Sequence, residues 1–560
     1  MHSGLEFLVV GVVALVAIAV ASMLSDRIRV AAPLVLVVVG LLVSLVPAVP
    51  RVEVDPEWIL AGILPPLLFS SAVSMPAMDF RRDFGVISGL SVLLVVASTA
   101  VIGVVLHLLV PGLGLAGGFA LGAILSPTDA VATSIVRRLG VAPRITTVLD
   151  GESLLNDATA LVVLRAAIAA TAVSVSVGGV FADFAIAVVV AVVVGLVVGK
   201  IGLIVRARVR QAPVSTVLSF VLPFAASVPA EQLGGSGLVA AVVAGLVTGQ
   251  GAIKYLSPQN RLADRQNWRT VELVLEGAIF LIMGLELTTV VADLRDDGGS
   301  VLRGVGLAAL ALALTILVRA AFVTPLIGIQ SRYARRSENL RPQLEGMGEK
   351  VVVGESFEFR GRTGKFDDPE RAERFRNRLQ LKIADIDYLL AEPIKVREGA
   401  VIVWAGMRGA VTLAAAQTLP EDMPLRSLLV FVAFLVASAS LLIQGGTLAW
   451  FVRLVRPSAP DPEELAAERH ELEARMRVAG IEVMERYRTH PLIAEFLERT
   501  ADEAQRPDPA DFRRLRLEMI EAQRETLIIA RGEGVFAASA LTVALENLDA
   551  EQISIELRGD

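Results

Sequence analysis

Two polar motifs interrupt long apolar stretches of the sequence, and they contain the residue types that bind hard cations. In the first, residues 126–129, Thr128 and Asp129 follow Pro127. A proline inside a helix removes a hydrogen bond and clashes with the preceding turn, so we predict a helix break there. The break leaves free carbonyl groups and a new helix N-terminus, which Thr128 or Asp129 can cap. A purely structural cap by Asp129 is the alternative.

The second motif places polar side chains on neighbouring stripes of a predicted helix. Ser153 and Asp157 are four residues apart and share a face, and Glu152 and Asn156 repeat that spacing on the adjacent stripe. With Asp129 of the first motif, Glu152 and Asp157 make three acids within apolar sequence, which are costly to keep for packing alone. A polar network between helices is nevertheless the structural alternative.

Together the two motifs predict a site for a monovalent cation. Hard cations take carboxylate, hydroxyl and carbonyl oxygens as ligands. We expect these ligands to come from Asp157, Ser153, Thr128 and Asp129.

One arginine can balance these acids. Arg408 lies near the middle of an apolar stretch, in Gly406-Met407-Arg408-Gly409, where the glycines weaken the helix. We predict that Arg408 pairs with Glu152 and Asn156, and that these three hold the site together. Snorkelling of Arg408 to an interface is the alternative. The other charged residues within apolar stretches are expected at interfaces or in local pairs: Arg165, Lys200, Glu272, Glu276 and Arg319.

The composition indicates the kind of molecule that must position these residues. Of 560 residues, 54% are hydrophobic and only 20% are charged, whereas a soluble domain carries about 25% charged residues. The chain has no cysteine, which excludes disulfides, thiolate metal sites and a cysteine nucleophile. The net charge of −6 gives no sign of nucleic-acid binding. We therefore expect an all-α polytopic protein of the lipid bilayer without a cofactor.

Thirteen stretches have about the 20 apolar residues that a helix needs to cross a bilayer. They cover residues 7–23, 30–48, 58–76, 84–110, 115–136, 146–172, 179–205, 214–229, 236–252, 270–292, 301–329, 399–419 and 424–452. Loops with an excess of Lys and Arg alternate without a break with loops that lack one. The positive-inside rule then places the N-terminus outside and the C-terminus in the cytoplasm. No A-x-A-like cleavage site follows the first stretch, so we interpret it as a true span.

The spans define the domain organisation. Residues 1–330 hold the first eleven spans and residues 399–456 the last two. Residues 331–398 are rich in Arg, Glu and Asp and form a cytoplasmic insertion, in which residues 351–359 alternate enough for a hairpin. Residues 457–560 show amphipathic spacing and form a helical cytoplasmic region, whose regulator the sequence does not identify. The broken fifth span and the glycine-rich twelfth are seven spans apart and therefore run in opposite directions, as in inverted-topology repeats.

In this order, the three motifs resemble the NhaP-like, NHE-like branch of the cation/proton antiporters. The resemblance covers about residues 1–330 and 399–456. It implies an inverted-repeat antiporter fold with discontinuous helices, in which a mobile core domain moves in an elevator-like manner against a dimerisation domain. It also implies a homodimer.

The same resemblance implies roles for individual residues. Asp157 would carry either the cation or the proton, with a backbone oxygen of Thr128 and the hydroxyl of Ser153 as further ligands. A Glu152–Arg408 pair would hold the core. The Asn-Asp form of the motif resembles members that exchange one cation for one proton without net charge movement.

One segment departs from the pattern of the family. Many members carry an acid in the third span after a Pro-Leu-Leu-Phe-like stretch. Here residues 65–69 are followed by Ser70 and Ser71. The departure leaves open whether a third-span acid contributes to ion binding or ion choice.

The predicted function is secondary antiport in the cytoplasmic membrane, exchanging Na⁺, or else K⁺ or Li⁺, for H⁺. A cation channel and a non-transporting ion or pH sensor on the same scaffold are the alternatives. A membrane hydrolase that uses the acids with Ser153 and Arg408 is disfavoured, because the chain has no cysteine and no clustered histidine.

Overall fold

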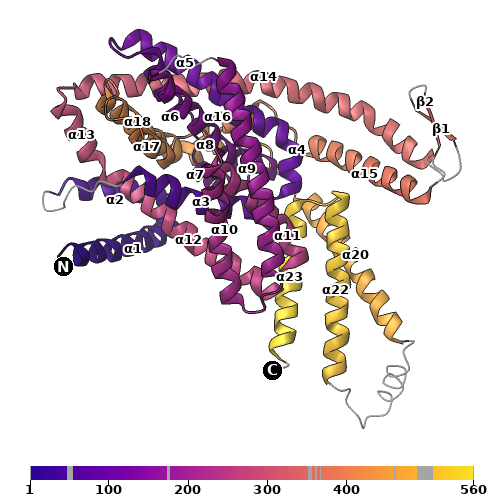
Figure 1. Cartoon of the computed structure of the whole chain (residues 1–560). Helices are drawn as coiled ribbons and strands as arrows, with labels where there is room; N and C mark the ends of the chain where they lie inside the picture. The colour runs from indigo at the N-terminus through magenta and orange to yellow at the C-terminus, as the bar shows by residue number, and fades with distance from the viewer. Residues whose placement is uncertain are drawn as a thin grey trace. The chain divides into compact units, whose positions relative to one another are not determined.

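The structure is a computed structural model that describes residues 2–28, 30–46, 55–172, 177–350, 356–359, 362–365, 368–459, 462–488 and 509–558. Within these ranges the chain is helical except for one two-stranded hairpin (Figure 1). The expected all-α class is therefore confirmed.

The helices of the N-terminal half include two π-helical segments, η1 and η2. In chain order they are α1 (His2–Ile28), α2 (Ala32–Ser44), η1 (Trp58–Ile63), α3 (Leu64–Ser74), α4 (Ala77–Ser88), η2 (Gly89–Leu93), α5 (Leu94–Leu109), α6 (Leu115–Ile124), α7 (Val131–Arg138), α8 (Pro143–Ala172), α9 (Val177–Arg206), α10 (Ala212–Gln232) and α11 (Gly237–Tyr255).

The C-terminal half contains the hairpin and a third π-helical segment. In chain order its elements are α12 (Pro258–Leu285), α13 (Leu287–Asp296), α14 (Val301–Lys350), β1 (Ser356–Phe359), β2 (Arg362–Lys365), α15 (Pro369–Ala391), α16 (Val396–Trp404), α17 (Ala410–Gln417), α18 (Arg426–Ser440), η3 (Leu441–Gly445), α19 (Gly446–Val455), α20 (Pro462–Arg488), α22 (Pro509–Glu533) and α23 (Ala538–Leu557).

Apolar helices account for the expected membrane spans. Among the described residues, 8 helices are long and apolar enough to cross a membrane, and four shorter apolar helices accompany them. Each of the thirteen predicted stretches contains helix. The count of thirteen crossings stays a prediction.

Glycines let neighbouring helices approach closely. A Cβ atom added at Gly40 of α2 would meet the backbone of Gly284, and one added at Gly284 would meet the backbone of α2. Small residues at helix contacts are typical of membrane proteins, where backbones pack directly. The C-terminal end of α12 is therefore held tightly against α2.

The chain divides into two compact units. The first comprises residues 1–256, 263–328 and 394–458, and contains the helices that carry the predicted site. The second comprises residues 257–262, 329–393 and 459–560.

In the second unit, the insertion is a helical hairpin. The C-terminal part of α14 packs on α15 through Leu344, Met347, Leu379 and Ile386. The strands β1 and β2 join the two helices and pair antiparallel, with Ser356 opposite Lys365. The sequence predicts a hairpin within residues 351–359. Of this segment the structure describes only β1, because residues 351–355 lie outside the described residues, and the partner strand β2 follows the segment.

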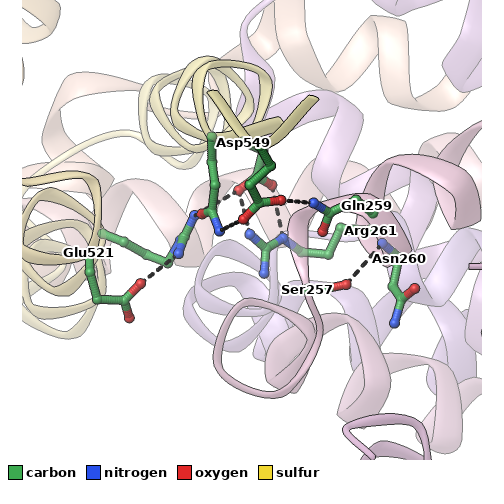
Figure 2. Close-up of polar contacts among 9 residues, drawn as sticks. Ser257, Gln259, Asn260, Arg261, Glu521 and Asp549 are labelled. Carbon is green, nitrogen blue, oxygen red and sulfur yellow. Dashed lines mark hydrogen bonds and ion pairs between the residues drawn. The ribbon is translucent and has the colours of Figure 1, made fainter. Parts of the chain in front are cut away.

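The last helix of the second unit is fixed by an ionic cluster (Figure 2). Asp549 of α23 accepts hydrogen bonds from Arg261, at 2.9 Å from its Nε, and from Arg524 of α22, at 3.3 Å. Two helical turns further along α23, Glu556 accepts a hydrogen bond from Gln259. Arg261 and Gln259 belong to the first turn of α12, so α23 docks on the N-terminal end of that helix.

Candidate functional site

The first helix break lies where Pro127 predicts it. Helix α6 ends at Ile124 and α7 begins at Val131. The Asp129 carboxylate accepts a hydrogen bond from the backbone N–H of Val131 at 2.8 Å. The N-cap residue of α7 is Ala130, and the Asp129 carboxylate just before it binds the N–H of the first helical residue.

The second break meets the first through the backbone. Helix α16 ends at Trp404 and α17 begins at Ala410. The Asp129 N–H donates a hydrogen bond to the Met407 carbonyl at 2.8 Å. A Cβ atom added at Gly409 would collide with the Asp129 carboxylate. Glycine at this position is therefore what lets the two broken helices cross.

Helix α8 presents its polar row to this crossing. Glu152, Ser153, Asn156 and Asp157 are all buried. The Asn156 amide nitrogen donates a hydrogen bond to the Thr128 hydroxyl at 2.5 Å. The second motif is thus in contact with the first through Asn156, which was predicted to pair with Arg408.

Two buried oxygen atoms of this row have no hydrogen-bond partner among the described residues: Asp157 Oδ1 and Asn156 Oδ1. A buried acceptor without a partner costs about 1–3 kcal/mol, and more when it is charged. Asp157 and Asp129 also lie close enough for their charges to interact. A proton or a cation at Asp157 would relieve both costs.

The acid that the sequence paired with Arg408 has another partner. Glu152 forms an ion pair with Arg319 of α14, with its Oε2 2.7 Å from Nη2 of the arginine. Arg319 also donates from Nε to the Ile402 carbonyl at 2.9 Å. A Cβ atom added at Gly406 would meet the Arg319 side chain, so this glycine leaves room for it. The predicted ion pair of Glu152 with Arg408 is therefore wrong. Arg319, expected at an interface or in a local pair, is buried and pairs with a residue 167 positions away.

The sequence contained a signal for Arg319 that the prediction did not use. Arg319 lies four residues from the centre of the predicted span 301–329, which is too deep for an interface. Its burial, with 1% of the residue exposed, follows from that depth.

Arg408 is also buried, but it binds backbone carbonyls. Its Nε donates to the Leu125 carbonyl at 2.8 Å, and Nη1 donates to the Gly406 carbonyl. Its own N–H donates to the Ser440 hydroxyl at 2.8 Å. Leu125 is the C-cap of α6, so Arg408 places a positive charge at the negative end of that helix dipole. Arg408 thus holds the breaks; it lies close enough to Glu152 for their charges to interact but forms no ion pair with it among the described contacts.

Two acids that were expected at interfaces or in local pairs face the site from α12. Glu276 lies close enough to Asp129 for their charges to interact, and Glu272 lies within hydrogen-bonding reach of Ser70. Their spacing of four residues, which places both on one face of the helix, was the signal. Helix α12 therefore brings a carboxylate to the position where the third span carries serine.

Comparisons of this chain with a family model and with known proteins agree on one family. The chain matches the family described as "Sodium/hydrogen exchanger, transmembrane" over residues 11–340. An "Uncharacterized Na(+)/H(+) exchanger" of Mycobacterium tuberculosis is 27% identical over 590 residues, covering 99% of this chain and 97% of that protein. The "Sodium, potassium, lithium and rubidium/H(+) antiporter" of Bacillus pumilus is 30% identical over 279 residues, covering 47% and 41%.

The fold is also shared with a solved structure. The sodium proton antiporter MjNhaP1 from Methanocaldococcus jannaschii superposes with a TM-score of 0.55 at 14% identity, covering 80% of this chain and 99% of that one. At that identity the likeness shows the fold alone.

Proposed function

Because this chain belongs to the sodium/hydrogen exchanger family, and is a transporter rather than an enzyme, we propose that it exchanges a monovalent cation for H⁺ with Asp157 as the carrier. The observation that supports Asp157 most directly is its buried Oδ1 atom, which lacks a hydrogen-bond partner among the described residues. The cation ligands proposed beside it are Ser153, Thr128 and Asp129.

Exchange follows from the cost of a bare buried carboxylate. A carboxylate in a low-dielectric site is stable only when it is neutralised. At Asp157 a proton and a cation compete for the same oxygens, so each leaves when the other binds. The helices around the site can move with either ion bound, and they resist moving with the bare carboxylate. No external energy source is required, because one gradient drives the other.

The crossing of the two broken helices supports alternating access around a fixed site. Many secondary transporters bind ions where discontinuous helices of two inverted repeats meet. We propose the same arrangement here, with elevator-like movement in a homodimer of the cytoplasmic membrane. The N-terminus would lie outside and the C-terminus in the cytoplasm.

Na⁺ is the proposed cation, with K⁺ and Li⁺ as the ions to compare. The Bacillus pumilus relative is named for several alkali cations, so the ion that this chain prefers must be measured and cannot be taken from that name. Glu272 and Glu276 add carboxylates beside the site from α12 and are candidates for setting that preference.

The test uses the purified protein in liposomes that contain a pH-sensitive dye. An imposed pH gradient should collapse when Na⁺, Li⁺ or K⁺ is added, and the Asp157→Asn variant should show no collapse. Asp150→Asn is the matched control, because Asp150 lies on the same helix and pairs with the exposed Arg137. Exchange by the Asp157→Asn variant at the wild-type rate would remove Asp157 from the mechanism.

The same experiment separates the other two functions. Flux of the cation without any movement of protons would favour a channel, since its flux needs no counter-ion. Absence of both fluxes in the wild type would favour a sensor on the same scaffold.

A further inference from the structure

A second buried acid lies outside the proposed site. Glu286 connects α12 to α13, and only 2% of it is exposed. Its Oε2 accepts a hydrogen bond from the amide nitrogen of Gln417 at 2.7 Å. Gln417 is the last residue of α17, the second half of the broken helix that crosses Asp129. The exchange proposed above gives neither side chain a role.

This hydrogen bond joins two different groups of helices. On one side, the end of α12 is fixed to α2 by the close contact of Gly40 and Gly284. On the other side, α17 starts beside Gly409, whose contact with Asp129 ties it to the site. The Glu286–Gln417 bond therefore connects the second broken helix to the outer end of α12, the helix that packs on α2 and whose Glu276 faces the site.

The bond lies toward the predicted outer side, and residues next to it there are buried. The C-terminal end of α13 and the residue after it hold Arg295 among three aspartates, and this stretch is predicted to be external. Thr289, one turn beyond Glu286, is 9% exposed, and Leu419, just beyond Gln417, is 2% exposed. Toward the predicted cytoplasmic side, Ala130 is exposed immediately after the half-buried Asp129. The neighbours of the bond are thus buried on its outer side, whereas the residue next to Asp129 is exposed on the side of α7.

We infer that the Glu286–Gln417 hydrogen bond is an outer latch, which must break each time the site opens to the outside. The inference rests on the proposed antiport, because alternating access requires the seal on each side to open in turn. A carboxylate strengthens this bond relative to a neutral acceptor. Glu286 therefore sets how often the outward-open state forms, and with it the external cation concentration at which exchange is half-maximal.

The absence of cysteine in the chain allows a direct test. A single cysteine is introduced as Thr289→Cys, since the Thr289 hydroxyl has no hydrogen-bond partner among the described residues. Its rate of reaction with a membrane-impermeant maleimide, added from outside to intact proteoliposomes, reports opening of the outer side. Glu286→Gln and Gln417→Ala are each combined with it.

Both combinations should react roughly fivefold faster than Thr289→Cys alone, because a charge-assisted bond is replaced by a neutral one or by none. Glu231→Gln is the matched control: it removes another predicted external acid, one that is exposed and 3.7 Å from Arg165. In the same vesicles, the external Na⁺ concentration for half-maximal proton flux should fall in the latch variants alone.

Equal labelling rates in all four proteins would overturn the latch, and so would equal acceleration by Glu231→Gln. The labelling readout does not depend on transport. Faster labelling in a protein that moves no protons would therefore support the latch and reject the proposed antiport. Normal antiport with unchanged labelling would support the proposed antiport and reject the latch.

Discussion

The Glu152 carboxylate is held by both terminal nitrogens of Arg319, a residue 167 positions further along the chain. Each residue is 1% exposed. The pair lies directly beside the site, since Glu152 also approaches the Thr128 hydroxyl at 3.5 Å. The ion pair therefore fixes α8 and α14 relative to the first helix break.

Removal of either partner of this pair should destabilise the fold. Arg319→Met leaves a buried, uncompensated carboxylate, which costs about 3–5 kcal/mol. Thermal unfolding in detergent should show a large loss for Arg319→Met and for Glu152→Met, and a much smaller one for the double variant, which buries no charge. Single variants as stable as the wild type would show that the pair has no structural role.

Gly409→Ala should disable the site without unfolding the protein. The added Cβ atom collides with the Asp129 carboxylate, so Asp129 must move and the crossing of the breaks opens. A displacement of about 1 Å at a reacting group commonly costs 100-fold in rate, and we expect a loss of that order in proton flux. Gly446→Ala is the control, because a Cβ atom there meets nothing within 4 Å. Equal flux in the two variants would contradict the crowding at Gly409.

Exchange should be electroneutral. One carboxylate that takes either one monovalent cation or one proton moves no net charge over a complete cycle. Initial rates in liposomes should therefore be the same with the membrane potential clamped at zero by valinomycin and K⁺ and with a potential imposed. A rate that changes steeply with potential would require a second charge to move, and Glu276 would be the first residue to replace.

The contact of α23 with the start of α12 should behave as a coupled pair. Asp549 and Arg261 are both mostly buried, with side chains 13% and 9% exposed. A double-mutant cycle of Arg261→Ala and Asp549→Ala, followed by hydrogen exchange of α23 in the full chain, should give a coupling energy of about 1–2 kcal/mol. Glu551→Gln, which breaks the more exposed pair with Arg516, should change exchange by less than about 0.5 kcal/mol. Additive effects in the cycle would mean that α23 is held by other contacts.

Glu398 should contribute a stability that depends on pH. Burial acts to raise the pKa of this carboxyl. The backbone N–H groups of Ser458 and Lys395 donate hydrogen bonds to it at 2.8 and 3.0 Å, and these bonds hold the pKa below its ordinary value. A lowered pKa stabilises the fold above the pKa of the unfolded state, and that stabilisation is lost as the pH falls through the lower, folded value. The difference in Tm between wild type and Glu398→Gln should be largest near neutral pH and vanish in acid. A Tm difference that grew as the pH fell would contradict a lowered pKa of Glu398 in the folded state.

The features that sequence predicted best are local. The break at Pro127 follows from one residue and its own turn, and the buried row of α8 follows from a four-residue repeat. The partner of Glu152 does not follow from local sequence, because three-dimensional packing decides which of two intramembrane arginines pairs with it. The burial of Arg319 could have been predicted from its depth in its span. The binding of Arg408 to carbonyl groups could not, because it depends on where the helix break leaves those carbonyls.

The separation of Glu152 from Arg319 along the chain has a consequence for synthesis. At about 5–20 residues per second, Arg319 leaves the ribosome roughly 10–30 s after Glu152. Throughout that interval the segment with Glu152 has already been made while its counter-charge does not exist. The early helices must therefore wait at the insertion machinery, or enter the bilayer with Glu152 protonated, until α14 arrives. Final burial of this half of the site is thus a late event in biogenesis, set by translation of the second half.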